Sequence, residues 1–163
     1  MIVWRIVKRK YAKRELLLSG QGAKEVGGRW NRSGLAVVYA SATSSLALLE
    51  TLVHAEASTL PSSLVAVQIV VPDDTLQREI KVSELPKRWR EVNNPQCIEI
   101  GSRWIESGES LALKVPSAVN PMESNVLLNP AHVDISRCKV GNQTSIQFDP
   151  RVVTLLARDF VDL

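Results

Sequence analysis

Cysteine is scarce in this chain of 163 residues, which contains only Cys97 and Cys138. Neither lies in a CxxC pair or at a spacing typical of zinc-binding Cys and His residues. The sequence therefore supports neither a disulfide framework nor a structural zinc site. We expect two unpaired, buried thiols and no metal.

Long apolar runs are missing as well. No stretch approaches the roughly 20 consecutive apolar residues that a membrane-spanning helix requires. The segment from Met1 to Arg5 lacks the basic start, the apolar run and the cleavage site of a secretory signal. The sequence therefore predicts a cytoplasmic protein with no membrane partner.

The common phosphate-binding and hydrolase motifs are also absent. The chain has no GxxxxGK[ST] segment, and the run from Gly20 to Gly27 misses the GxGxxG spacing and precedes no predicted helix. HExxH and GxSxG do not occur either. With only His54 and His132 on the chain, a two-histidine acid/base pair of the ribonuclease type stays open, although each histidine is equally explained as a structural residue.

The remaining composition is that of a globular domain. Hydrophobic residues make up 45% of the chain and charged residues 23%, with eight glycines and eight prolines. These values exclude wholesale disorder, collagen-like repeats and a coiled coil. The length predicts a single domain over residues 1–163.

Positive charge is concentrated near the N-terminus. Residues 1–32 contain nine Lys and Arg against two Glu, a net charge of +7, while the whole chain carries only +3. Such a cluster either binds phosphates of a nucleic acid or nucleotide, or is a solvated surface. The charge alone does not decide between them.

Hydrophobic patterns predict the elements in outline. Short runs rich in β-branched residues predict strands over 2–7, 35–40, 64–71, 111–115, 126–128 and 145–148, of which 64–71 is expected to be central. Helical spacing and caps predict helices over 44–57 and 97–107 and a short one after Asp149-Pro150. The glycine-rich run 19–34 and the polar run 75–95 are expected to be loops, the first long and mobile. Because strands and helices do not alternate regularly, we predict an α+β domain with a mixed, mostly antiparallel sheet.

A few polar residues lie in mainly apolar segments, and each has a functional and a structural interpretation. Arg29 is a ligand or a solvated cation, and Tyr39 is a site residue or a core aromatic. Glu50, four residues from Leu46 on the predicted helix and near its apolar stripe, is a site carboxylate or a solvated one. Ser117, considered together with Asn125, is a site residue or a turn residue after Pro116.

Taken together, the segments around these residues are more specific. Five motifs occur in a fixed order: GGRWN over 27–31, VYAS over 38–41, SLALLETLVH over 45–54, VPSAV over 115–119 and NVLLNP over 125–130. This order resembles the RES-domain family, the toxin half of Xre–RES toxin–antitoxin pairs. The Arg, Glu and Ser that give the family its name correspond by motif to Arg29, Glu50 and Ser117. The resemblance runs from about Arg5 to Arg151.

The resemblance implies a compact fold similar to ADP-ribosyltransferases and a type II toxin that halts growth by cleaving the nicotinamide–ribose bond of NAD, by hydrolysis or phosphorolysis. It implies NAD as the substrate and no cofactor or metal. Glu50 would hold a ribose hydroxyl beside the developing cation. Arg29 would grip the pyrophosphate, with Arg5 as a second anion ligand. Tyr39 would stack on nicotinamide, and Ser117 with Asn125 would hydrogen-bond the nicotinamide amide or the ribose.

The resemblance also implies a partner, a small helix-turn-helix antitoxin of the Xre type, which would make any contact with DNA. We expect this antitoxin to cover the run 19–34 or the cleft beside it. Three alternatives remain open at this point: ADP-ribose transfer to a protein target, an RNA-binding or RNA-cleaving toxin, and an inactive module that only binds the partner.

Overall fold

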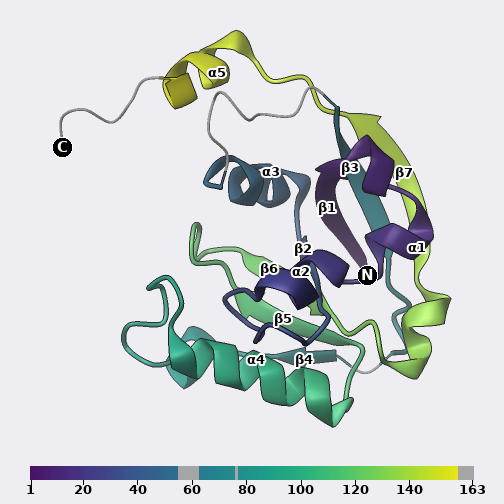
Figure 1. The fold of residues 1–163 in the computed structure, drawn as a ribbon, viewed down its shortest axis with the longest axis vertical. Coiled ribbons are helices and arrows are strands. Elements are labelled where there is room, and N and C mark those ends of the chain that lie inside the picture. Colours follow the sequence, from purple (N-terminus) through teal and green to yellow (C-terminus); the bar gives the residue numbers. More distant parts are fainter. Residues whose placement is uncertain (55–62, 76, 158–163) are drawn as a thin grey trace.

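The computed structural model describes residues 1–54, 63–75 and 77–157. Figure 1 shows the arrangement. The strands are β1 (Ile2–Lys8), β2 (Val38–Ser41), β3 (Leu64–Val70), β4 (Gln77–Glu79), β5 (Ala112–Pro116), β6 (Ser124–Leu128) and β7 (Lys139–Ser145). The α-helices are α1 (Arg14–Leu17), α2 (Gln21–Val26), α3 (Ser44–Leu52), α4 (Pro95–Ser107) and α5 (Pro150–Ala157). Short 3₁₀ helices are η1 (Arg9–Tyr11), η3 (Val82–Glu84) and η4 (Val133–Arg137).

The seven strands form one sheet in the order β4-β5-β6-β2-β1-β3-β7. Every neighbouring pair is antiparallel except β4 and β5, which run parallel. The predicted fold class, α+β with a mixed and mostly antiparallel sheet, is confirmed. The predicted strand 64–71 is β3, an interior strand between β1 and β7.

Alternation along the strands divides the core into two clusters, one on each face of the sheet. Val38 and Ala40 of β2 belong to the first cluster, which also contains Leu17 and Leu18. Tyr39, between them in sequence, packs against the second cluster, which is covered by α4. In Figure 1, α3 lies beside β1 and β2, α4 lies along β4 and β5, and α1 lies on the opposite side of β1 and β3 from α3.

The two longer helices of the core have clear start signals. The Thr43 side chain caps α3 by accepting a hydrogen bond from the Leu46 backbone N–H. Asn94 caps α4, Pro95 occupies its first turn, and Gly108 ends it with a φ of 62°. The predicted helix 97–107 is thus confirmed and starts slightly earlier.

The expectation of a long, irregular loop over 19–34 is wrong. Gly20 (φ 63°) and Gly27 (φ 76°) both have a positive φ at the two ends of α2, so these glycines bound a helix instead of breaking one. Trp30 and Asn31 are buried, with 2% and 0% of their surface exposed. The side chain of Asn31 donates to three backbone carbonyls, which fixes the turn that follows α2.

Other boundaries differ from the sequence prediction. The run 75–95 contains β4 and η3, because β4 gains its hydrogen bonds from the distant β5, a pairing without a local signal. The last strand is β7, Lys139–Ser145, and not 145–148; its burial pattern is largely exposed, so it lacks the apolar alternation used to find strands. β2 starts only at Val38, and α3 ends at Leu52, while the predicted helical residues 55–57 lie outside the described part.

Both cysteines are free and buried, as expected. Within the described residues, no helix is long and apolar enough to cross a membrane.

The docking of α4 predicts one strongly destabilising substitution. A Cβ on Gly101 would lie 2.0 Å from the backbone oxygen of Trp30, whereas a Cβ on Gly22, also helical, would meet nothing within 4 Å. We therefore expect Gly101→Ala to lower the free energy of unfolding by about 3 kcal/mol or more. The control Gly22→Ala should raise it by about 0.4–1 kcal/mol. Urea denaturation of both variants checks this, and a Gly101→Ala variant as stable as the wild type would contradict it.

Candidate functional site

Glu50 on α3 receives two hydrogen bonds on the same carboxylate oxygen. Ser117 Oγ donates to Glu50 Oε1 at 2.7 Å, and Asn125 Nδ2 donates to it at 2.6 Å. Ser117 is fully buried, while Glu50 and Asn125 are half-buried. Three of the residues selected from the sequence thus meet at one point, although they come from α3, β6 and the segment after β5.

Ser41 extends this cluster along the sheet. β2 and β6 pair so that Ser41 lies opposite Asn125, and Ser41 Oγ donates to Asn125 Oδ1 at 2.7 Å. Sequence analysis missed Ser41. The alternation in VYAS could have indicated it, because Ser41 lies on the same strand face as Tyr39.

Tyr39 lies where β2 meets the segment 28–31. Its hydroxyl accepts a hydrogen bond from the Trp30 backbone N–H at 3.0 Å and donates to Asn31 Oδ1 at 2.8 Å. A Cβ on Gly28 would lie 2.6 Å from this hydroxyl, so a larger residue there would displace it. Burial raises the pKa of Tyr39 to about 12, against the opposing effects of the Trp30 hydrogen bond and the Arg29 charge. The phenol is therefore neutral near pH 7 and acts as a hydrogen-bond donor, not as a base.

The Arg29 side chain reaches the segment before α4. Its Nη1 donates to the backbone oxygens of Trp89 and Glu91, each at 2.8 Å. Arg90, between them, donates from Nε to the Ala118 backbone oxygen at 3.0 Å. The segment 89–91 therefore connects Arg29 with the turn that carries Ser117, a link that sequence analysis did not find.

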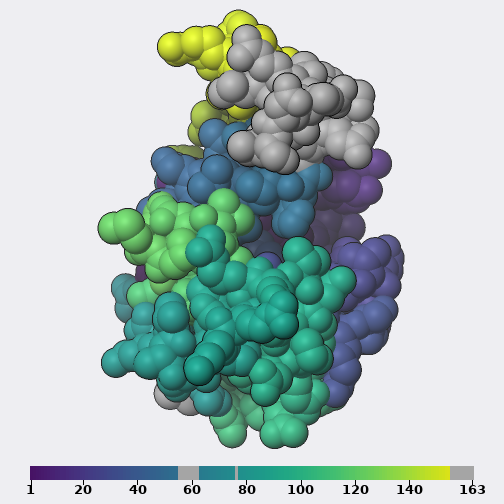
Figure 2. All heavy atoms as spheres, turned by 90° about the vertical axis from the view of Figure 1, so that its left-hand side faces the viewer, coloured from purple at the N-terminus to yellow at the C-terminus, as the bar shows by residue number. Residues whose placement is uncertain are grey.

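These hydrogen bonds, together with the backbone that joins Arg29 to Trp30, Tyr39 to Ser41, Trp89 to Glu91 and Ser117 to Ala118, form a closed circuit, which we call the site ring. It consists of Arg29, Trp30, Asn31, Tyr39, Ser41, Glu50, Trp89, Arg90, Glu91, Ser117, Ala118 and Asn125. In Figure 2, α3 (blue), the teal region around α4, the green segment before β6 and the α2 region surround a hollow in the surface. The segments that carry the site ring thus border a concave region.

Arg5 is not part of this ring. On β1, Trp4 pairs with Ser41 of β2, so the two side chains share a face of the sheet. Arg5 follows Trp4 and therefore points to the opposite face. The Arg5 guanidinium donates instead to the Leu17 backbone oxygen. Burial lowers the pKa of Arg5. The geometry gives Arg5 a place beside α1, and its anion-binding role remains a prediction.

Among the described residues, no hydrogen bond or ion pair links His54 with His132. His54 is exposed just after α3. His132 Nδ1 accepts a hydrogen bond from the Asp134 backbone N–H and so caps η4. The described residues also contain no group of three or more His, Cys, Asp or Glu arranged to hold a metal ion.

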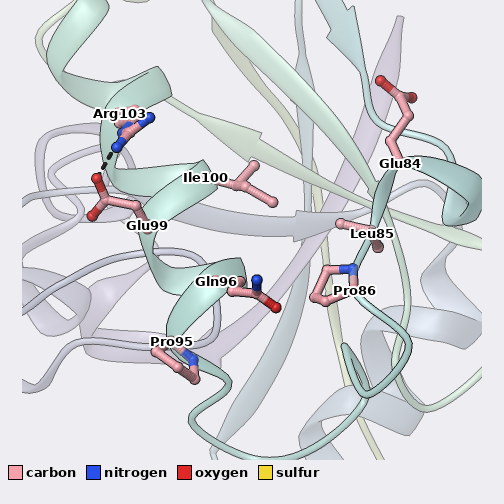
Figure 3. Close-up of a pocket in the computed structure, with 8 residues that line it drawn as sticks. All are labelled: Glu84, Leu85, Pro86, Pro95, Gln96, Glu99, Ile100 and Arg103. Carbon is pink, nitrogen blue, oxygen red and sulfur yellow. Dashed lines mark hydrogen bonds and ion pairs between the residues drawn. The ribbon is translucent and has the colours of Figure 1, made fainter.

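A groove of about 540 Å³ lies elsewhere, between the outer face of α4 and the segment 84–86. Figure 3 shows its apolar floor, which includes Leu85 and Ile100, and the ion pair between Arg103 and Glu99 at its rim. A second hollow of about 420 Å³ includes Met1, Arg78 and Lys114. Neither contains a residue of the site ring, so the converging polar groups identify the candidate site better than cavity size does.

Comparisons with known proteins identify the family of the chain. The family described as "RES domain" matches residues 2–149. A protein named "Toxin Res" from Yersinia enterocolitica is 40% identical over 154 residues, which covers 93% of this chain and 99% of that protein. A "Prs ADP-ribosylating toxin" from Sphingobium sp. is 42% identical over 139 residues, 83% of this chain and 86% of that protein.

A solved structure of low sequence identity shares the fold. The toxin–antitoxin complex MbcT–MbcA from M. tuberculosis includes a chain that superposes with a TM-score of 0.72 at 16% identity, covering 97% of this chain and 89% of that chain. At this identity the likeness shows the fold alone. The family match over most of the sequence, together with the two closely similar toxins, shows that the chain belongs to the RES-domain family.

Proposed function

We propose that this protein is the toxin of a type II toxin–antitoxin system and that it cleaves the nicotinamide–ribose bond of NAD at the site ring. The observation that carries the proposal is the half-buried carboxylate of Glu50, held by Ser117 and Asn125 on the circuit that also contains Arg29 and Tyr39. The named toxins among its relatives support the toxin role.

The chemistry needs only one carboxylate. Nicotinamide in NAD is already a cationic pyridinium, so it leaves with the bonding electron pair and requires no proton donor. The ribose carbon then carries oxocarbenium character, which a fixed negative charge stabilises. Glu50 supplies that charge, and water or phosphate attacks the ribose carbon to complete hydrolysis or phosphorolysis. NAD is the substrate, and the mechanism invokes no cofactor or metal.

The other ring residues suit binding. Arg29 uses Nη1 on two backbone oxygens, and its remaining N–H groups are suited to a pyrophosphate. Tyr39, neutral and partly buried, offers an aromatic face for nicotinamide.

Transfer of ADP-ribose to a protein is the second candidate. It is favoured by one observation, the name "Prs ADP-ribosylating toxin" of a relative that is 42% identical. Both activities start with loss of nicotinamide, so they differ only in the group that attacks the ribose. RNA cleavage has no comparable support, because His132 already serves as a helix cap.

The partner we propose is a helix-turn-helix antitoxin of the Xre type, with DNA contacted only through it and with action in the cytoplasm. The likeness to a chain of a toxin–antitoxin complex supports an antitoxin partner.

Glu50→Gln tests the central role. The variant keeps the size of the side chain but removes its charge, so we expect nicotinamide release to fall at least ~100-fold while NAD affinity and thermal stability stay close to wild type. Nicotinamide is followed by chromatography, with and without phosphate. The control is Glu15→Gln, at an exposed carboxylate on α1. Wild-type protein that is folded yet releases no nicotinamide would overturn the proposed activity, and near-normal turnover of Glu50→Gln would remove Glu50 from it.

Arg29→Lys should weaken NAD binding about tenfold or more, because lysine keeps the positive charge but loses the planar, multidentate donor geometry. Isothermal titration with NAD measures the affinity. Arg103→Lys, at an exposed position on α4, is the matched control. An unchanged NAD affinity in Arg29→Lys would assign Arg29 to the structural contacts with Trp89 and Glu91 alone.

We expect the antitoxin to block entry to the hollow without refolding the toxin. Hydrogen exchange of the toxin alone and in a co-expressed complex should show new protection in segments 28–31, 39–50 and 117–125. Protection confined to segments far from the site ring would contradict entrance blocking and require inhibition at a distance.

A further inference from the structure

We propose that Ser117, Asn125 and Ser41 are positioning residues that act through Glu50: they hold its Oε1 atom and leave Oε2 to receive a ribose hydroxyl of NAD. This inference rests on the proposed function and assigns a different role to each of the two carboxylate oxygens of Glu50. It changes the expected roles of Ser117 and Asn125, which the family resemblance places in direct contact with NAD.

The Ser117 hydroxyl has its proton direction fixed. Its oxygen accepts hydrogen bonds from the backbone N–H groups of Val119 (3.1 Å) and Asn120 (3.0 Å). A hydroxyl has a single proton to donate, and with both acceptor positions used that proton points to Glu50 Oε1. Ser117 therefore has no donor left for nicotinamide or ribose.

The Asn125 amide is oriented from both ends. Its NH₂ group faces the Glu50 carboxylate at 2.6 Å, and its oxygen receives the Ser41 hydroxyl proton at 2.7 Å. If the amide rotated by half a turn, its oxygen would face the Glu50 oxygen and two acceptors would repel each other. Ser41, with 4% of its surface exposed, satisfies the amide oxygen that would otherwise remain unpaired.

Both donors converge on Oε1, and no hydrogen bond to Oε2 occurs within the described residues. One carboxylate oxygen thus fixes the rotation of the Glu50 side chain, and the other is available for a hydroxyl of the substrate. A residue held in this way before substrate arrives loses little entropy in the transition state. Removing the support should lower kcat more than it changes NAD affinity.

Ser41→Ala is the principal test. We expect kcat for nicotinamide release to fall about tenfold, the effect of losing one neutral hydrogen bond, with the Kd for NAD unchanged. Ser41→Thr, which keeps the hydroxyl and suits a strand, should restore kcat. Ser45→Ala, at an exposed serine of α3, is the matched control. Asn125→Ala is the second variant and should also lower kcat without weakening NAD binding.

An independent measurement follows the Asn125 side-chain NH₂ group by NMR. In the wild type this group should show two well-separated proton resonances with slow solvent exchange, and Ser41→Ala should accelerate the exchange. Unchanged kcat in Ser41→Ala or Asn125→Ala, or a loss confined to NAD affinity, overturns the positioning roles while the wild type stays active. Absence of nicotinamide release by the wild type instead refutes the proposed function, which separates the two failures.

Discussion

The pairing of β2 with β6 is the constraint on which the site depends. Its register places Ser41 opposite Asn125 and Tyr39 opposite Leu127. A shift by one residue would turn every side chain of β2 to the other face of the sheet. Val38 and Ala40 would then leave the first core cluster, and Tyr39 and Ser41 would enter it. Burial of the small and branched residues on one face therefore fixes the polar residues on the other.

The second half of the site depends on α4. Close approach at Gly101 lets α4 contact the Trp30 backbone, Ser102 Oγ accepts the Arg32 N–H at 3.0 Å, and Arg32 forms ion pairs with Glu99 and Glu106. These exposed ion pairs add little stability by themselves. The close backbone packing and the buried indole of Trp30 hold the segment 28–31 in place. They therefore also fix the backbone position of Arg29.

Local sequence predicted the parts of the molecule that have local causes. Thr43 before α3 and Gly108 after α4 act through neighbouring residues, and β3 shows its burial as a continuous apolar run. The missed features, β4 and β7, depend on partners far along the chain and lack an apolar pattern. The glycines around α2 were misread because glycine at a helix end and glycine in a loop look alike in sequence. For the site, the motifs selected Glu50, Ser117 and Asn125, but they could not show that Arg29 reaches Trp89.

The proposed mechanism gives a reason for the several residues that hold Glu50 in place. A charge stabilises a developing cation most when it is already in place. Moving the charge during the reaction would cost reorganisation energy that offsets the stabilisation. The residues of the ring come from segments that are distant in sequence. Each segment fixes the position or orientation of a different side chain. Strand register sets Ser41 and Asn125, the turn at 117–120 sets the Ser117 proton, and α3 sets the Glu50 backbone. Arg90 donates to the Ala118 backbone oxygen, and its neighbour Trp89 accepts from Arg29, so this segment connects Arg29 with the turn beside the Glu50 carboxylate. Under the proposed function, a pyrophosphate on Arg29 would lie two hydrogen-bonded steps away from the turn that orients Glu50.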